Sequence, residues 1–305
     1  MRVFRSSSRD VHENLAWEEH LLDFEAGAGE PILAFTVNDR SVVLGRNQNA
    51  WREVRHAVVR RAGLRVARRL SGGGTVYHDA GNLNYSLMLP RAVYQRDRIF
   101  DLVLRGLAAC GVSATRSGTH SLVTGGRKFS GSAFCFRRDL ALHHGTLLLA
   151  ADLAALQDCL TPSLPGVATT AVASVPAPVV NLGEVVPGLQ SDHLQAALVE
   201  ALAAGLDSPA RLGEIDADWI AAADRHRSWD WVYGQSPAFS VPLDGGTGPV
   251  TCTVREGRII ALDGPAPARD QVLGLRFGAE VVAAVRTADD PTALGWWETA
   301  LADVI

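Results

Sequence analysis

Three consecutive glycines beside two arginines are the residues of this sequence best suited to chemistry. Residues 67–79 read ARRLSGGGTVYHD. Glycines cost backbone entropy and bury no side chain, so three together favour a loop that approaches a ligand closely. Their N–H groups can line an anion-binding concavity, and Arg68 and Arg69 add charge suited to a carboxylate or phosphate. A tight turn between strands would explain the same glycines. The absence of GxxxxGKS/T and GxGxxG excludes a P-loop and a Rossmann site.

Lys128 is the only lysine in the chain, in which every other Lys/Arg position is arginine. It lies in a strand-like segment followed by small residues, GRKFSGSA over 126–133. A lysine in this setting can hold a compact ammonium close to an acyl phosphate. The common alternative is an ordinary solvated lysine.

Two pairs of adjacent residues each contain a histidine that could act as a base. His143 and His144 precede an apolar run, and adjacent residues of a strand point to opposite faces, so at most one of them faces a site. His78 and Asp79 could form a base and the carboxylate that orients it. Hydrogen-bonded structural histidines and a turn-stabilising aspartate explain the same residues.

The composition is that of a globular protein. The chain has 305 residues, 47% hydrophobic and 20% charged, with a net charge of −4. No global basic field indicates nucleic acid or a membrane as a partner, and no apolar run reaches the roughly 18 residues of a membrane span. Four cysteines without CxxC spacing argue against structural zinc and a disulfide framework. No signal-peptide pattern is visible, so we expect a cytoplasmic protein, with a mitochondrial location as the alternative.

Hydrophobic periodicity predicts both helices and strands. The predicted helices cover 11–24, 51–62, 99–110, 151–159 and 192–204. The predicted strands cover 32–37, 41–45, 64–67, 75–77, 83–89, 121–123, 128–136 and 140–149, with the first two joined as a hairpin. The Pro-rich segment 161–178 has no period and is predicted to be a long ordered loop, which inside a compact domain is often functional.

These elements predict an α+β fold in which a mixed or antiparallel sheet is flanked by helices. The pattern of predicted elements changes near residues 222–233, after which short strands and then helices follow. We therefore expect a catalytic domain over 1–220 and a smaller α+β C-terminal domain over 225–305.

At this point several motifs, in order along nearly the whole chain, resemble the lipoate–protein ligase A family, which includes lipoyltransferases and has the biotin/lipoate ligase fold. The matching motifs are NLAWEE at 14–19, GRNQNAWRE at 45–53, ARRLSGGGTVYHDAGN at 67–82, KFSGSA at 128–133, HHGTLL at 143–148, NL at 181–182 and WDWVYGQSPAF at 229–239. Each motif alone is weak, whereas their order and spacing are specific.

The resemblance implies that lipoate and ATP react, with Mg²⁺, to give lipoyl-AMP. The lipoyl group then passes to a lysine of an acceptor domain such as a 2-oxoacid dehydrogenase E2 subunit or the glycine cleavage H protein. The family motifs imply a catalytic role for Lys128. They imply nucleotide contacts at Arg69, Gly74, Thr75, Val76, Tyr77 and Lys128. They imply a lipoate site at Ser71, Gly72, Gly73, Gly74, Lys128, Gly131, Ser132, Ala133, His144 and Thr146. No metal ligand is implied on the chain, because the Mg²⁺ accompanies ATP.

The chemistry fits these roles. Adenylation brings a carboxylate against the α-phosphate, and a fixed ammonium with loop N–H groups stabilises that crowded charge. An apolar slot for the acyl chain gains about 0.8 kcal/mol for each buried methylene. Val76, Tyr85 and Leu87 are candidates for its wall, and they are equally suited to the core.

Departures from the family pattern leave alternatives open. Cys135 stands where a basic residue is usual, and residues 174–178 lack arginines, which favours a lipoyltransferase that uses pre-formed lipoyl-AMP or a lipoylated donor. A thioester enzyme would need Cys135 as its nucleophile. A biotin ligase lacks support because its arginine- and glycine-rich loop is missing. Lys128 and Arg69 argue against a non-enzymatic lipoate-binding protein.

Overall fold

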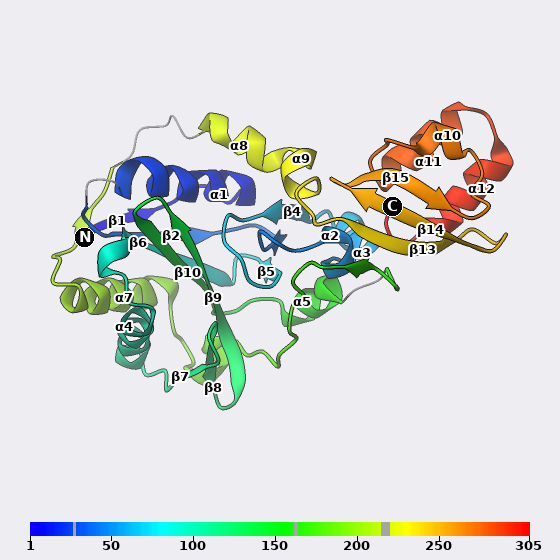
Figure 1. Cartoon of the computed structure of the whole chain (residues 1–305). Coiled ribbons are helices and arrows are strands. Elements are labelled where there is room, and N and C mark those ends of the chain that lie inside the picture. Colours follow the sequence, from blue (N-terminus) through cyan, green and yellow to red (C-terminus); the bar gives the residue numbers. More distant parts are fainter. Residues whose placement is uncertain (27–28, 162–163, 215–219) are drawn as a thin grey trace.

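An eight-stranded mixed sheet lies at the centre of the larger part of the molecule (Figure 1). The computed structural model describes residues 1–26, 29–161, 164–214 and 220–305. In sheet order the strands are β12 Arg211–Leu212, β1 Arg2–Arg5, β2 Ile32–Val37, β6 Asn82–Pro90, β10 Leu140–Leu148, β9 Arg127–Arg137, β8 Ser121–Thr124 and β7 Thr115–Ser117. The strand β1 is parallel to β2 and β12, whereas the other neighbours are antiparallel, so the predicted mixed sheet is confirmed.

Helices cover both faces of this sheet. The helical segments of this part are α1 Val11–His20 with its π-helical continuation η1 Leu21–Glu25, α2 Ala50–Glu53, α3 His56–Arg61, the 3-10 turn η3 Arg91–Val93, α4 Arg96–Ala109, α5 Leu153–Leu160, α6 Leu182–Val185, α7 Ser191–Gly205, α8 Ile220–Arg227 and α9 Trp229–Val232. The helices α4 and α7 pack on one face with Tyr85 and Leu87, and α1 packs on the other with Met88 (Figure 1). The side chains that alternate along residues 83–89 therefore contact the helical layers on the two faces of the sheet.

A separate three-stranded sheet carries the glycine loop. Its strands, in order, are β4 Arg65–Arg68, β3 Ser41–Leu44 and β5 Val76–His78. The predicted hairpin between 32–37 and 41–45 is therefore wrong, because β2 and β3 belong to different sheets. The short link is held between the two sheets by Asn38, whose side chain contacts Asn14 and His78.

The predicted helix over 51–62 is also interrupted. Asn49 caps α2 by accepting the N–H groups of Trp51 and Arg52. Val54 then adopts an extended conformation and ends α2 before α3 begins. The ring of His56 bonds the carbonyl of Ala50 across this break. The carbonyl of Ala50 thus contacts both the N–H of Val54 and the ring of His56, a local side-chain bond that accompanies the end of α2.

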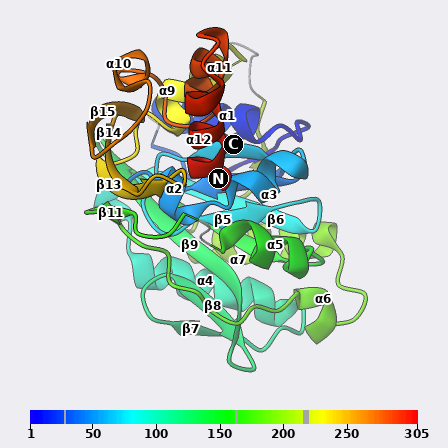
Figure 2. The ribbon, with the colours of Figure 1, turned by 90° about the vertical axis from the view of Figure 1, so that its right-hand side faces the viewer.

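The C-terminal module is a four-stranded sheet backed by helices. Its elements are β11 Ala168–Thr169, β13 Phe239–Asp244, β14 Pro249–Arg255, β15 Arg258–Asp263, α10 Arg269–Val272, α11 Ala279–Thr287 and α12 Pro291–Ala300. This module lies away from β7 and β8 (Figures 1 and 2). It shares a hydrophobic core with the three-stranded sheet, since the ring of Trp51 lies 5.1 Å from Phe239 and 5.7 Å from Phe277.

The Pro-rich segment joins the two parts. Apart from 162 and 163, which lie outside the described residues, the segment 161–178 holds only the two-residue strand β11, which pairs with β13. The predicted domain boundary, between 220 and 225, falls within the helix α8, which contacts α1 of the larger part. All four cysteines are free.

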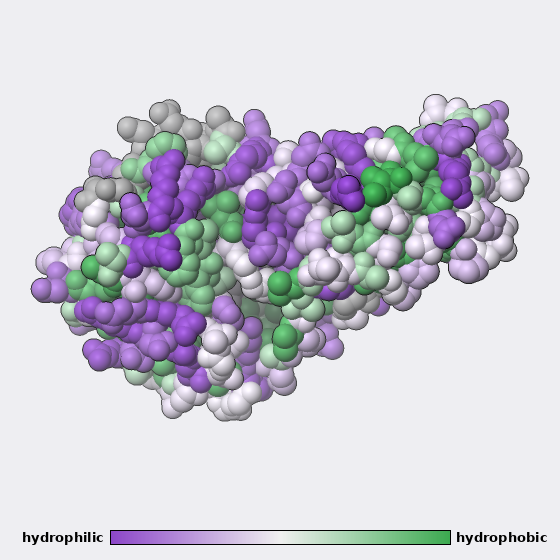
Figure 3. Space-filling view, in the orientation of Figure 1, coloured by the Kyte–Doolittle hydropathy of each residue, from purple (hydrophilic) through white to green (hydrophobic). Residues whose placement is uncertain are grey.

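No helix among the described residues has the length and apolarity to cross a membrane. On the face seen in Figure 3, hydrophobic residues form separate groups among hydrophilic ones.

Candidate functional site

The glycine loop connects β4 to β5 and is folded around the buried guanidinium of Arg69. Arg69 Nη2 donates to the carbonyl oxygens of Gly72 and Gly74 at 2.6 and 2.7 Å, and Nε donates to Ser71 Oγ at 3.0 Å. Burial lowers the pKa of Arg69 to about 10, and Glu18 opposes this shift. Arg69 remains charged at neutral pH, and its guanidinium donates four hydrogen bonds, including one to the carbonyl of Val43, to the protein itself. Its side chain therefore shapes the loop.

A second backbone segment lies directly against the loop. A Cβ on Gly45 would overlap the carbonyl oxygen of Gly73, so only glycine fits there. Arg46 N–H donates to the carbonyl of Ser71 at 2.8 Å. Among the described residues, no partner is recorded for the N–H groups of Gly72, Gly73 and Gly74. These amides are available to an anion, as the sequence predicts.

Ser71 begins a chain of hydrogen bonds that crosses from the loop to the large sheet. Ser71 Oγ lies 2.6 Å from His144 Nε2, and His144 Nδ1 lies 2.8 Å from Glu18 Oε2. Ser86 Oγ donates to the same carboxylate oxygen at 2.5 Å. Burial raises the pKa of Glu18, but the His144 charge and the bonds from His144 and Ser86 outweigh it, so that pKa is lowered. Glu18 is therefore an ionised, buried carboxylate.

Lys128 lies at the start of β9 with its backbone fixed on two sides. Its N–H donates to Pro178 O at 2.8 Å, and its carbonyl accepts from Val180 at 3.0 Å. A Cβ on Gly131 would stand 3.3 Å from Lys128 Nζ, so the ammonium lies over that glycine. Burial, followed by the charge of Arg69, lowers the pKa of Lys128. No partner of Nζ is recorded in the described parts of the chain.

Thr146 completes this end of the site. Gly131 N–H donates to Thr146 Oγ1 at 3.1 Å. Thr146 follows His144 by two residues on β10 and thus points to the same face of the sheet. Ala133 is opposite His144 in the register of β9 and β10, and a Cβ on Gly73 would be 3.7 Å from its methyl group. The structure therefore brings Lys128, Gly131, Ala133, His144 and Thr146 to the face that the glycine loop covers.

The Pro-rich segment reaches the end of the glycine loop. Ser174 Oγ accepts the N–H of Thr75 at 2.9 Å and the Nε2–H of Gln48 at 2.9 Å. The Oε1 of Gln48 accepts from Thr75 Oγ1 and from Gly45 N–H. Glu53 accepts the N–H of Ser174 at 3.2 Å. This network closes the Pro-rich segment over Thr75.

Three predicted site residues point elsewhere. Tyr77 is buried in the core shared with the C-terminal module, and its hydroxyl accepts from Arg40. Val76 packs beside Val43. Ser132 faces α4 with its Oγ 3.4 Å from Tyr85 Oη, on the face opposite His144. Only the backbone of these three residues is placed to line the site, and Tyr85 and Leu87 belong to the α4 core rather than to a slot on the His144 face.

The pair His78 and Asp79 does not form a base with its orienting carboxylate. His78 Nδ1 contacts Asn38, and burial lowers its pKa to about 3, so it is neutral. Asp79 instead accepts the N–H groups of Gly81 and Asp152. The turn-stabilising interpretation of Asp79 is the one that the structure supports.

Cys135 shares the His144 face but packs beside the hydrophobic cluster of α1. Burial, with the nearby charge of Glu18, raises the pKa of its thiol. A thiolate is the reactive form, so this setting disfavours a nucleophilic cysteine.

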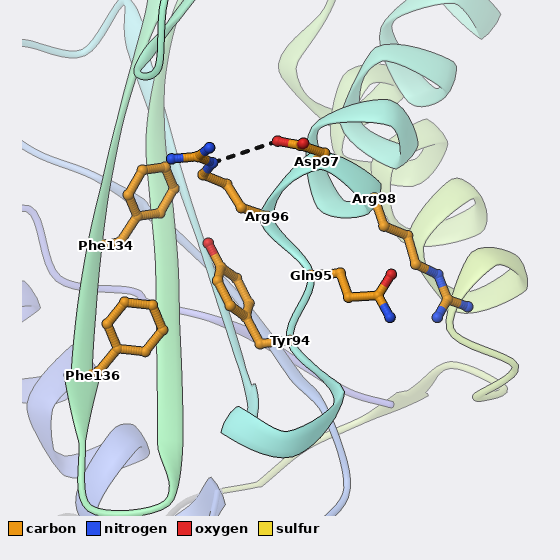
Figure 4. A pocket seen from close by; sticks show the side chains of 7 residues that line it. All are labelled: Tyr94, Gln95, Arg96, Asp97, Arg98, Phe134 and Phe136. Carbon is orange, nitrogen blue, oxygen red and sulfur yellow. Dashed lines mark hydrogen bonds and ion pairs between the residues drawn. The ribbon is translucent and has the colours of Figure 1, made fainter.

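A shallow pocket on the other face of β9 is unrelated to this site. Phe134 and Phe136 line it together with Tyr94, Gln95 and Arg96 (Figure 4). Phe134 pairs with His143 in the register, and both point away from the His144 face.

Sequence reasoning missed Glu18, Gln48 and Ser174. Glu18 and Gln48 lie within motifs that carried the resemblance but were assigned no role. Their side chains acquire one only when α1 and the 45–53 segment pack on the glycine loop.

Comparisons with known proteins show which family the chain matches. Residues 10–203 match the model of the lipoyl protein ligase A/B catalytic domain. The chain is 34% identical over 258 residues to a lipoate-protein ligase A of Bdellovibrio bacteriovorus, covering 80% of this chain and 75% of that protein.

Two solved structures share the fold. P. falciparum LipL1 in complex with lipoate has a TM-score of 0.68 and 23% identity, covering 93% of this chain and 94% of that chain. A lipoate-protein ligase A bound with ATP has a TM-score of 0.67 and 23% identity, covering 77% and 98%. The family match extends over most of the larger part of the molecule and includes the glycine loop, Lys128 and His144. The chain belongs to the lipoyl protein ligase A/B family.

Proposed function

We propose that this protein is a lipoate–protein ligase, which forms lipoyl-AMP from lipoate and ATP and transfers the lipoyl group to a lysine of an acceptor protein. The ammonium of Lys128 carries the proposal. It is the chain's only lysine side chain, it lies over Gly131, and the described residues supply it with no counter-ion. The relative that is 34% identical is a lipoate-protein ligase A.

Lys128 acts in both steps. In the first, a carboxylate oxygen of lipoate attacks the α-phosphorus of ATP and pyrophosphate leaves. The ammonium stabilises the charge that accumulates between carboxylate and phosphate, together with the amides of Gly72, Gly73 and Gly74. In the second, the acceptor amine attacks the acyl carbon, AMP leaves, and the same ammonium holds the developing charge on the carbonyl oxygen.

Mg²⁺ enters this reaction as part of the ATP substrate. The described residues contain no group of three or more His, Cys, Asp or Glu side chains placed to hold a metal ion, so the proposal assigns no protein ligand to it. The acceptor is a lipoyl domain of a 2-oxoacid dehydrogenase E2 subunit or an H protein. We assign catalysis to residues 1–220 and an accessory role to the module over 225–305, and we place the protein in the cytoplasm.

The test is incubation of the purified protein with ATP, Mg²⁺, lipoate and a lipoyl acceptor domain, with the acceptor mass as the readout. A parallel reaction receives pre-formed lipoyl-AMP without ATP. A ligase modifies the acceptor in both, whereas a pure transferase does so only in the second. Acceptor that remains unmodified in both reactions would exclude the function.

The thioester alternative receives its own variant. Cys135→Ser removes a thiol with little change of volume. A ligase retains its rate in this variant, because Cys135 takes part in neither step. Loss of transfer in a folded Cys135→Ser protein would favour the thioester enzyme instead.

A further inference from the structure

We propose that Ser71 and His144 form a proton relay that serves only the transfer step, with Glu18 as its positioning residue. The inference rests on the proposed function and names which groups remove the proton of the acceptor lysine. An attacking lysine begins as an ammonium and must lose a proton before its nitrogen can attack. Lipoate attacks as a carboxylate, so adenylation needs no base.

When His144 is neutral, as a base must be, the hydrogen-bond chain has a single consistent direction. Ionised Glu18 only accepts, so His144 Nδ1 carries the proton shared with it at 2.8 Å. His144 Nε2 is then an acceptor, and Ser71 Oγ donates to it across 2.6 Å. Arg69 Nε donates to the same Ser71 oxygen at 3.0 Å. A hydroxyl oxygen has two lone pairs, so one lone pair of Ser71 remains for an incoming donor.

The proton movement balances. The acceptor ammonium passes its proton to the free lone pair of Ser71 Oγ, while the Ser71 hydroxyl proton moves to His144 Nε2. The neutral amine then bonds to the acyl carbon, which leaves its nitrogen with one proton more than an amide holds. That second proton passes to a phosphate oxygen of AMP as AMP leaves with the electrons of the acyl–phosphate bond. His144 ends as an imidazolium against the Glu18 carboxylate, and releases its proton to solvent when the product departs.

The relay lies beside the reacting centre. His144 and Thr146 share one face of β10, two residues or about 7 Å apart. Thr146 Oγ1 contacts Gly131, over which Lys128 Nζ lies. A substrate carbonyl held at Lys128 would therefore lie on the face of the sheet on which His144 contacts Ser71.

Glu18, on α1, orients the ring of His144 through its contact with Nδ1. Its carboxylate is buried between α1 and β10, and Ser86 bonds the same oxygen. A carboxylate in this position fixes the tautomer of the ring and stabilises the imidazolium, a role that an orienting carboxylate commonly has.

Three rates of the purified full-length protein test the relay. Pyrophosphate release from ATP and lipoate, without acceptor, reports adenylation. Acceptor mass after mixing with pre-formed lipoyl-AMP reports transfer to lysine. Capture of enzyme-bound lipoyl-AMP by hydroxylamine, an amine that is unprotonated at neutral pH, reports transfer without the need for a base.

We expect Ser71→Ala and His144→Gln to slow transfer to lysine by at least about 100-fold, and to slow adenylation at saturating lipoate and hydroxylamine capture by far less. Glu18→Gln slows the same step by less. The matched control is His143→Gln, the neighbouring histidine on the opposite face, which keeps all three rates. Retained adenylation also shows that each variant is folded.

An equal fall of all three rates in His144→Gln would show that the chain only holds the loop in place and would overturn the relay. So would a transfer rate that stays at the wild-type level. Because transfer starts from pre-formed lipoyl-AMP, the relay is tested even if the wild-type protein forms no adenylate, an outcome that would contradict the ligase assignment alone.

Discussion

The hydroxyl oxygen of Ser174 accepts the backbone N–H of Thr75 at 2.9 Å. This bond ties the Pro-rich segment to the end of the glycine loop, where the family resemblance places the nucleotide. Gln48 Nε2 donates to the same oxygen. If the Thr75 amide contacts ATP, Ser174 and the nucleotide compete for one donor.

Ser174→Ala should therefore strengthen ATP binding. The substitution leaves the Thr75 amide without its partner, and a hydrogen bond of this kind contributes about 1 kcal/mol, equivalent to about fivefold in affinity. Calorimetry with a non-hydrolysable ATP analogue measures it. The control is Val175→Ala, since the neighbouring valine is 86% exposed and its truncation should change nothing. Weaker binding in Ser174→Ala would mean that Ser174 contacts the nucleotide.

Lys128 should lose its function at alkaline pH earlier than an ordinary lysine. Its pKa is lowered from 10.5 by burial and by Arg69, and the charged form is the one that acts. Adenylation should thus decline as pH rises through a value below 10.5. Pyrophosphate release across the alkaline range measures the decline. At neutral pH, Lys128→Ala should slow adenylation by about 100- to 1000-fold.

A matched control for Lys128 lies next to it. Arg127 is exposed and pairs with Glu184, away from Gly131, so Arg127→Ala should retain the wild-type rate. Because the chain has one lysine, an amine-directed reagent modifies only Lys128 and the N-terminus. ATP with lipoate should protect Lys128 from it. Wild-type adenylation in Lys128→Ala would remove the basis of the mechanism.

Sequence periodicity predicted most of the large sheet but not the separation of the two sheets. The strand β6 has nine residues, and larger apolar side chains alternate with mostly polar ones along it. This alternation indicates a strand, although the fold buries both of its faces. The strand β3 is buried at all four positions and follows β2 closely, which looks like a hairpin. Only the buried side chain of Asn38, bonded to Asn14 and His78, shows that the chain changes sheets.

The site was predictable where one residue acts through its backbone or its charge, as for Lys128 and the glycines. It was not predictable where three distant segments meet. Glu18, Ser71 and His144 are separated by 53 and 73 residues (71 − 18 and 144 − 71), and their hydrogen bonds exist only after α1 packs on the sheet. The family motifs implied that Arg69 contacts the nucleotide, whereas in the structure its Nη2 donates to two carbonyl oxygens of its own loop.

Substitutions at two glycines should distinguish a structural role from a contact with lipoate. A Cβ on Gly45 would overlap the Gly73 carbonyl, so Gly45→Ala should displace the loop, lower the melting temperature and abolish adenylation. A Cβ on Gly72 meets nothing within 4 Å, so Gly72→Ala should retain the melting temperature. If lipoate lies against Gly72, the KM for lipoate rises in that variant alone. Thermal unfolding and lipoate titration distinguish the two, and an unchanged KM in Gly72→Ala would remove Gly72 from the lipoate site.

Glu19 should make the fold sensitive to acid. Its carboxylate accepts from Arg137 at 2.7 Å and contacts Arg225 and His226, which joins α1 to β9 and α8. Burial raises its pKa, but these partners outweigh burial and lower it from 4.5 to about 2. A depressed carboxyl pKa stabilises the fold above the unfolded-state value, and the stabilisation is lost as pH falls from 4.5 towards 2.

Glu19→Gln should therefore lower the free energy of unfolding at neutral pH by at most about 3 kcal/mol, and by much less near pH 2. Urea unfolding at several pH values measures the difference. Glu13 is the matched control, because it lies on the same helix and pairs with the partly exposed Arg227. Glu13→Gln should cost no more than about 1 kcal/mol. If the wild-type and Glu19→Gln curves ran parallel through this pH range, the Glu19 cluster would not be the source of the acid sensitivity.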